Sequence, residues 1–187
     1  MKAERAEWPA HQPALEVTQL VFLDETGVST TMTRTRGRAP VGERCVASVP
    51  HGHWKTTTCS AGLRVGAVSA PLLRDGAMDG EAFLGYRREF LGPTLHPGDI
   101  IIADNLRRHT VEGVREASEA QGATLRSVPP SSPDLNPIEK LFSTLQALRR
   151  KAAHRTVDAL WEAIATLLDT FSATECANYF KSSGYNA

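Results

Sequence analysis

The sequence has little that would place it among disulfide-rich, secreted or membrane proteins. Its 187 residues include 3 cysteines, which are widely spaced and form no Cys-x-x-Cys pair, so neither a disulfide framework nor a zinc ribbon is indicated. No apolar run approaches the roughly 18–20 residues that span a bilayer, and residues 1–8 lack the apolar stretch of a secretory signal. These absences predict a cytosolic protein without a membrane partner.

The chain also lacks an excess of charge of either sign, with 21 Lys and Arg against 21 Asp and Glu. Because phosphate neutralisation dominates DNA affinity, a stand-alone DNA-binding module is usually basic. The neutral total therefore counts against tight DNA binding by this chain alone. Basic residues still cluster at positions 34–38, 107–109 and 149–155. Each cluster is either a solvated face or, if it lies beside suitable acids, part of a path for a nucleic-acid strand.

What is present indicates one globular domain, since 41% of the residues are hydrophobic. Residues 1–15 contain two prolines and several charges without periodicity, and are interpreted as an irregular lead-in to a domain over residues 16–187. Apolar and β-branched runs predict strands over residues 15–23, 30–35, 54–68, 99–103 and 124–128. Helical spacing predicts helices over residues 79–91, 110–120 and 136–152, and from 157 onward. This order indicates an α/β fold with a mixed sheet flanked by helices, as in ribonuclease-H-like proteins.

Two acids follow apolar runs that read as buried strands. Asp24 ends the run of residues 20–23, and Asp104 ends the run of residues 100–103. Ligands of open α/β sheets bind beyond the carboxyl ends of the strands, and an ionised side chain against a buried strand needs a partner. Asp24 is hard to account for without a cation, whereas Asp104 could equally cap the turn that follows its strand.

A third acid, Glu139, follows a proline-rich loop that runs into a helix. Asn136, Pro137 and Glu139 also fit a capping box, with Asn136 as N-cap, so Glu139 has a structural explanation as well. It falls at the border of the apolar stripe of the helix, from which it could face the strand ends.

Taken together, three carboxylates on three rigid elements suit magnesium, which prefers carboxylate oxygen and water. Two such ions about 3.5–4 Å apart can activate water or a 3′-hydroxyl and stabilise the leaving oxygen. Metal-dependent phosphoryl transfer on nucleic acid is therefore the leading interpretation. Asn105 could orient a ligand or form a turn, and His109 could contact a phosphate, support Asp104 or simply begin a helix.

Several motifs occur together along the chain: LDETG (23–27), GRAP (37–40), PHGHWKT (50–56), GDI (98–100), DNL (104–106) with His109, PPSSPDLNPIE (129–139) and ECANYF (175–180). With these motifs the chain resembles the DDE transposases of bacterial insertion sequences in the Tc/mariner superfamily. Asp104 and Glu139 are 139 − 104 = 35 positions apart, which is the separation typical of that superfamily.

The resemblance implies a ribonuclease-H-like catalytic core, Mg²⁺ or Mn²⁺ as cofactor, and cut-and-paste transposition of DNA. It assigns Asp24, Asp104 and Glu139 as the catalytic and metal-binding acids. It implies transposon ends and target DNA as partners, a possible homodimer, and a place at the bacterial nucleoid. Residues beside the motifs are candidates for supporting the acids or contacting DNA: Asn105, Arg107, Arg108, His109, Arg38 and Lys140.

The sequence departs from the family pattern at several positions. Ser131 stands where the family usually has tyrosine, Gln146 where it has lysine, and Arg107 and Arg108 where it often has small polar residues. Family members also carry N-terminal helix-turn-helix domains, for which residues 1–15 are too short. The chain is therefore expected to be a catalytic portion that works with a separately encoded DNA-binding portion. The alternative is a truncated, non-catalytic remnant that at most pairs with full-length transposase.

Overall fold

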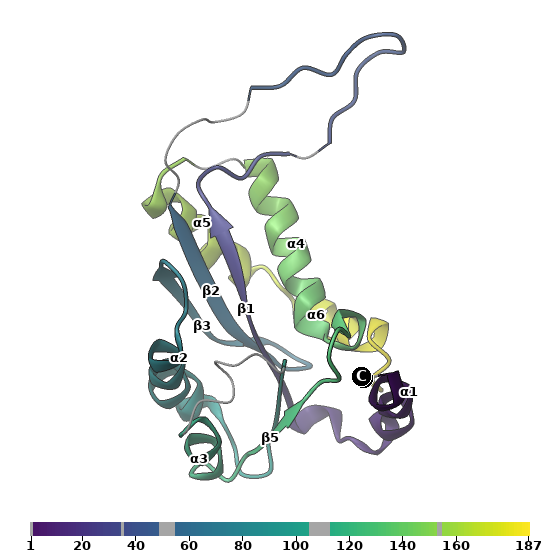
Figure 1. Cartoon of the computed structure of the whole chain (residues 1–187), viewed down its shortest axis with the longest axis vertical. Coiled ribbons are helices and arrows are strands. Elements are labelled where there is room, and N and C mark those ends of the chain that lie inside the picture. Colours follow the sequence, from purple (N-terminus) through teal and green to yellow (C-terminus); the bar gives the residue numbers. More distant parts are fainter. Residues whose placement is uncertain (1, 35, 49–54, 105–112, 153–154) are drawn as a thin grey trace.

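Five strands form one mixed sheet in the order β3-β2-β1-β4-β5 (Figure 1). The computed structural model describes residues 2–34, 36–48, 55–104, 113–152 and 155–187. The strands are β1 (Leu20–Ser29), β2 (Thr56–Leu63), β3 (Val68–Asp75), β4 (Ile100–Ala103) and β5 (Thr124–Ser127). β2 pairs antiparallel with both β1 and β3, whereas β4 pairs parallel with both β1 and β5.

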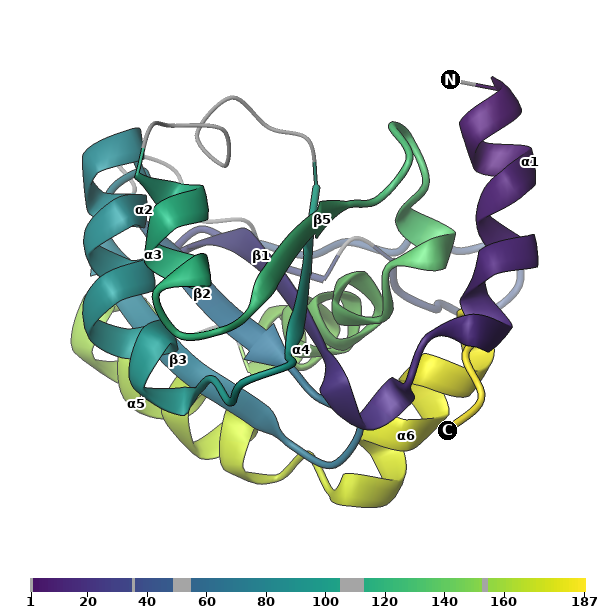
Figure 2. The same ribbon diagram turned by 90° about the horizontal axis from the view of Figure 1, so that it is seen from below.

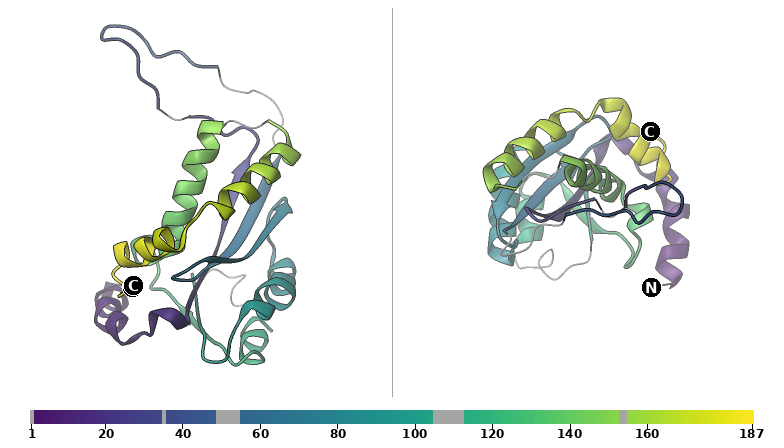
Figure 3. Two further views of the ribbon diagram at one scale, coloured as in Figure 1. Left: turned by 180° about the vertical axis from the view of Figure 1, so that it is seen from behind. Right: turned by 90° about the horizontal axis from the view of Figure 1, so that it is seen from above.

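Helices cover both faces of this sheet. They are α1 (Lys2–His11), α2 (Gly80–Tyr86), α3 (Val114–Glu119), α4 (Pro137–Ala152), α5 (Val157–Asp169) and α6 (Ala173–Ser182). α4, α5 and α6 lie on one face, and α2 and α3 lie on the other (Figures 2 and 3). The predicted mixed α/β architecture is confirmed. Among the described residues, no helix is both long and apolar enough to cross a membrane.

The alternation of side chains along β1 divides the core into two parts. Leu20 and Phe22 pack with the α4–α6 layer, whereas Val21 and Leu23 pack with the α2 side. The Phe22 ring makes edge-on contacts with Phe180 of α6, at 5.3 Å between ring centroids. These four residues at the start of β1 (20–23) are fully buried, so this strand lies at the centre of the domain.

The strand boundaries differ from the prediction in several places, and β3 (Val68–Asp75) lies almost wholly beyond the predicted range of residues 54–68. β1 continues through Asp24 to Ser29, because it pairs with β2 over its whole second half. Polar residues at buried positions, such as Thr26, hid this half of the strand from a hydrophobicity pattern. No strand forms in the described part of residues 30–35, and residues 36–48 extend away from the body of the domain (Figure 1).

The irregular lead-in predicted for residues 1–15 is wrong for most of its length, since α1 occupies Lys2–His11. Tertiary contacts place this helix beside the C-terminal residues of the chain. Trp8 Nε1 donates a hydrogen bond of 3.1 Å to the Tyr185 hydroxyl, and Gln12 Nε2 donates one of 2.9 Å to the Ser183 carbonyl. Such long-range contacts leave no periodic signal in the helix itself.

One buried position of α4 carries a charge. Leu148 is apolar and stands at helical spacing from Leu141 and Leu145, yet it is 38% exposed, whereas the neighbouring Arg149 is 1% exposed. The Arg149 Nε and Nη1 atoms have no hydrogen-bond partner, and burial lowers the pKa of its guanidinium. An unsatisfied buried polar group lowers stability.

We therefore expect Arg149→Met to stabilise the domain by about 1–3 kcal/mol, because the flexible thioether side chain removes the unpaired donors and still fills the space. The free energy of unfolding in urea, measured in EDTA, checks this. Lys151→Met, at an exposed position of the same helix, is the matched control and should change stability by less than about 0.5 kcal/mol. A destabilised Arg149→Met would contradict the reasoning.

Candidate active site

The parallel pairing of β1 with β4 brings two predicted acids together. The last register pair is Leu23 with Ala103, so Asp24 and Asp104 follow at adjacent positions of neighbouring strands. Phe22 and Ile102, two residues earlier, both face the α4 side of the sheet, and side chains two residues apart share a face. Both carboxylates therefore face α4. The sequence suggested that Asp24 ends its strand. Asp24 instead lies within β1, because β1 continues its pairing with β2 beyond this residue.

The third predicted acid approaches from α4. Glu139 lies in the first turn of that helix and is exposed. An open hollow of about 260 Å³ is lined by Asp104, Glu139, Asn136 and the proline-rich loop of residues 128–133. The structure thus brings the three predicted acids into one neighbourhood from three elements.

The electrostatics of Asp24 reflect this crowding of acids. Burial is the main cause that raises the pKa of Asp24 to about 8; the Glu139, Asp104 and Glu25 carboxylates contribute to the same rise, and the hydrogen bond from the Glu25 backbone N–H opposes it. That N–H donates to Asp24 Oδ1 at 2.8 Å. All the charged side chains that shift this pKa are acidic, so a cation placed here would relieve both desolvation and repulsion.

Asn136 takes a position that the sequence did not indicate. The predicted capping box is wrong, because Asn136 Nδ2 donates to Asp24 Oδ2 at 3.4 Å and Asn136 Oδ1 has no hydrogen-bond partner. The Glu139 backbone N–H instead donates to the Asn136 carbonyl, at 3.2 Å. The helix start is therefore satisfied by the backbone, and the amide side chain faces the acids.

Residues near both ends of the described chain contact the loop that leads into α4 and Glu139. Arg5 of α1 donates two hydrogen bonds of 2.9 Å to the Asp134 carboxylate and one of 3.2 Å to the Ser131 carbonyl. Near the C-terminus, the Tyr185 hydroxyl donates to the Leu135 carbonyl at 3.1 Å. The loop is thus held by side chains far away in the sequence.

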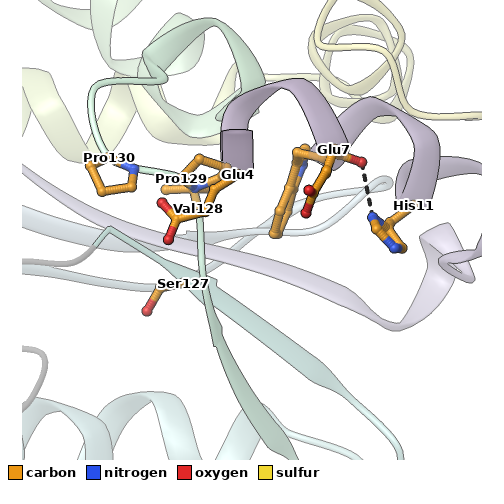
Figure 4. A pocket seen from close by; sticks show the side chains of 8 residues that line it. Glu4, Glu7, His11, Ser127, Val128, Pro129 and Pro130 are labelled. Atoms are coloured by element: carbon orange, nitrogen blue, oxygen red, sulfur yellow. Dashed lines mark hydrogen bonds between the residues drawn. The ribbon is translucent and has the colours of Figure 1, made fainter. Parts of the chain in front are cut away.

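A second pocket of about 370 Å³ lies between α1 and the start of the same loop (Figure 4). Glu4, Glu7 and His11 face Pro129 and Pro130 across it. Its acidic lining does not suit a nucleic-acid backbone. This pocket shares residues 128–130 with the hollow at the acids. Because of its acidic lining, we do not include it in the candidate site.

Of the remaining predicted contact residues, Arg38 and Lys140 lie in the part of the chain that the structure describes. Asn105, Arg107, Arg108 and His109 lie outside the described residues. Arg38 is exposed on the segment 36–48, which projects beyond the C-terminal end of α4 (Figure 1), at the opposite end of that helix from Glu139. Lys140 donates to the Ser182 carbonyl and, at 2.9 Å, to the Ser182 hydroxyl. It therefore joins α4 to α6, and a DNA contact by Lys140 stays a prediction.

In the described part of the basic cluster at residues 149–155, Arg150 and Arg155 are engaged by the protein itself. Arg150 donates to Gln146 at 3.0 Å, and Gln146 donates to the Thr26 hydroxyl at 2.6 Å. Arg155 donates to the carbonyls of Thr30 and Met32. With Arg149 buried, these side chains hold α4 and the end of β1 together and do not form one free basic face.

The donor set suits a hard divalent cation, since carboxylate oxygens are the ligands that such ions prefer. In the part of the chain that the structure describes, however, no three His, Cys, Asp or Glu side chains form a group able to hold a metal ion. The unsatisfied Asn136 Oδ1 and the mutual repulsion at Asp24 are the features that a bound cation would relieve. The residues present therefore fit such a group chemically.

Comparison with models of known protein families assigns the chain to a family. Residues 19–161 match the model of the DDE superfamily endonucleases. The chain belongs to this family. The predicted affiliation is thereby confirmed, and all three predicted acids lie inside the matched region. A search among curated proteins finds no match.

Solved structures agree with the fold of a DDE endonuclease. A Mos1 transposase paired-end complex with left transposon end has a TM-score of 0.76 at 15% identity and covers 98% of this chain. The chain spans 57% of that protein. The catalytic domain of Mos1 mariner transposase has a TM-score of 0.69 at 14% identity, covering 98% of this chain and 86% of its own. The predicted ribonuclease-H-like fold is thus confirmed.

Two further structures show that catalytic domain with Raltegravir, one with Mg and one with Mn. Both have a TM-score of 0.69, at 14% and 13% identity, and each covers 98% of this chain. The structure with Mg is covered over 87% of its chain. Fold likeness at this identity does not assign the catalytic residues of this DDE endonuclease, so Asp24, Asp104 and Glu139 stay predictions.

The raised pKa of Asp24 gives the metal-free protein a distinctive pH dependence. Folding keeps this carboxyl protonated between its unfolded pKa, near 4, and its folded pKa of about 8. Its contribution to stability is therefore greatest below pH 4, falls by about 1.4 kcal/mol per pH unit through the window, and is lost above pH 8. The variant Asp24→Asn lacks this titration.

The unfolding free energies of wild type and Asp24→Asn in EDTA at pH 6 and pH 9 measure the effect. Wild type should lose more stability than Asp24→Asn between the two values, by about 2–3 kcal/mol. Asp158→Asn, at an exposed position of α5, should behave as wild type. Parallel pH profiles for wild type and Asp24→Asn would show that the site does not hold a protonated carboxyl.

Proposed function

We propose that the chain is the catalytic portion of a metal-dependent DNA transposase of the Tc/mariner type, encoded by a bacterial insertion sequence. The observation that carries the proposal is the side-by-side placement of Asp24 and Asp104, with Glu139 beside them. Structural likeness to the Mos1 catalytic domain and membership of the DDE superfamily endonucleases support it. The overall reaction is hydrolysis of a phosphodiester at the transposon end, followed by attack of the freed 3′-hydroxyl on a phosphodiester of target DNA, which joins the transposon end to the target and releases a 3′-hydroxyl of the target strand.

Asp24, Asp104 and Glu139 would together hold Mg²⁺ or Mn²⁺, with two ions as the proposed number. When bound, such ions lower the pKa of an attacking water or hydroxyl and neutralise charge on the leaving oxygen. The protein's own contribution is to place the carboxylates on rigid elements. Asp24 is held in a central strand, Asp104 directly follows a strand, and Glu139 lies in the first turn of a helix braced through its loop.

The DNA partner would approach the open side of the hollow, where Glu139 is exposed. Because the chain has no net charge, Arg149 is buried, and Lys140 and Arg150 bond to other protein groups, we propose that DNA affinity comes from elsewhere. A separately encoded helix-turn-helix portion, or a second copy of the chain, would supply it. The chain spans 57% of the Mos1 chain. The alternative to a catalytic role is a non-catalytic remnant.

Nicking of supercoiled plasmid with Mg²⁺ tests the proposal. Asp104→Asn should lower the nicking rate by at least about 100-fold, because loss of a metal-binding carboxylate removes several kcal/mol of transition-state stabilisation. Glu162→Gln, on the exposed side of α5, is the control and should retain the wild-type rate. Equal activity of Asp104→Asn and wild type would refute the assignment of this acid. A wild-type chain that binds Mg²⁺ but does not nick DNA would support the remnant.

A further inference from the structure

The side chain of Asn136 is buried in the candidate site and only half satisfied. Asn136 is 3% exposed, and its Nδ2 lies 3.4 Å from Asp24 Oδ2. Its Oδ1 is buried and has no hydrogen-bond partner among the residues that the structure describes. A buried amide oxygen left unpaired lowers the stability of a protein, so this position calls for a ligand that the described protein groups do not supply.

The role of a helix cap does not explain this side chain. The residue before a proline is restricted to extended backbone, and Asn136 has φ −109° and ψ 100°. In that conformation its backbone carbonyl accepts from the Glu139 N–H. The side-chain oxygen is therefore not needed at the start of α4.

The surroundings of Asn136 limit what its oxygen could bind. The hollow that it lines is also lined by Asp104 and Glu139, and its amide contacts Asp24. Ionised carboxylates are acceptors only and offer no proton to an amide oxygen. Asp24, which the metal-free protein keeps protonated, pairs with the amide nitrogen of Asn136 and not with its oxygen. A hard cation, by contrast, is bound by carboxylates together with backbone or Asn carbonyl oxygens.

We infer that Asn136 supplies a neutral oxygen ligand to the divalent cation of the site, while its amide group orients Asp24. This inference rests on the proposed function, because it assumes that the three acids hold a cation. A neutral ligand adds an oxygen without a fourth negative charge. That matters because a fourth carboxylate would repel the phosphodiester substrate.

Binding of Mn²⁺ alone tests the inference without any turnover. The full chain is titrated with Mn²⁺, and the free ion is followed by electron paramagnetic resonance. Asn136→Ser keeps a good helix N-cap but removes the amide, and should weaken Mn²⁺ binding by about 10-fold or more. Asn136→Asp keeps an oxygen at the same place and should bind Mn²⁺ within about 3-fold of wild type, or more tightly.

The matched control is Asn178→Ser, at an exposed position of α6, which should bind Mn²⁺ as wild type does. Melting of each variant in EDTA verifies that the titrated protein is folded. Unchanged Mn²⁺ affinity in Asn136→Ser would overturn the inference. So would an equal loss in Asn136→Ser and Asn136→Asp, since the oxygen would then be irrelevant.

Asp104→Asn separates this inference from the proposed function. If Asp104→Asn loses Mn²⁺ binding while Asn136→Ser keeps it, the metal site stands and the inference about Asn136 alone fails. If Asp104→Asn binds Mn²⁺ as tightly as wild type, the proposed cation site fails and the inference falls with it. Loss of binding in both variants, with binding retained in Asn136→Asp, supports both.

Discussion

The parallel pairing of β1 with β4 is the constraint on which the rest of the site depends. Its register aligns Leu23 with Ala103 and so places Asp24 and Asp104 at adjacent positions on one face of the sheet. The apolar residues before them anchor both strands in the core. A shift of one residue between the strands would turn one carboxylate to the opposite face, because side chains alternate along a strand. The hydrophobic pattern that specifies the sheet therefore also specifies the distance between two acids.

The position of the third acid, Glu139, depends on contacts between segments far apart in the sequence, which hold the loop before α4. The loop before α4 contains prolines, which restrict its backbone, but it is also held from outside by Arg5 and Tyr185. Arg5 and Asp134 are both about half exposed, so their ion pair is of modest strength. Its value lies in geometry, since it connects α1 to the loop that carries Asn136 and leads to Glu139.

The domain tolerates buried groups that weaken it. Asp24 lies in the core beside other acids, and burial raises its pKa to about 8. The orphaned Asn136 oxygen adds a further cost nearby. These groups concentrate at the candidate site, where local strain and unsatisfied groups are commonly found. Arg149, in contrast, is buried far along α4 from Glu139, and nothing in its surroundings explains its charge.

Much of the site was accessible to sequence reasoning because its signals are local. An acid directly after an apolar run, and a proline loop before a helical pattern, can be read residue by residue. The same reasoning missed α1, whose stability comes from contacts with Ser183 and Tyr185 rather than from periodicity. It also missed the second half of β1, where Asp24 and Thr26 are polar yet buried. The capping signal of Ser172 with Glu175, which begins α6, was present but not used.

The sequence by itself determined the family, the order of most elements and the three acids, because composition, spacing and motif are properties of the chain. Only the tertiary structure decided which side chains meet. In it, the Asn136 side chain contacts Asp24 and does not cap α4, and Lys140 bonds to Ser182. It also buried Arg149 in place of Leu148. These outcomes depend on packing between segments that are 42 or 112 residues apart or on small rotations of a helix, and neither leaves a local trace in the sequence.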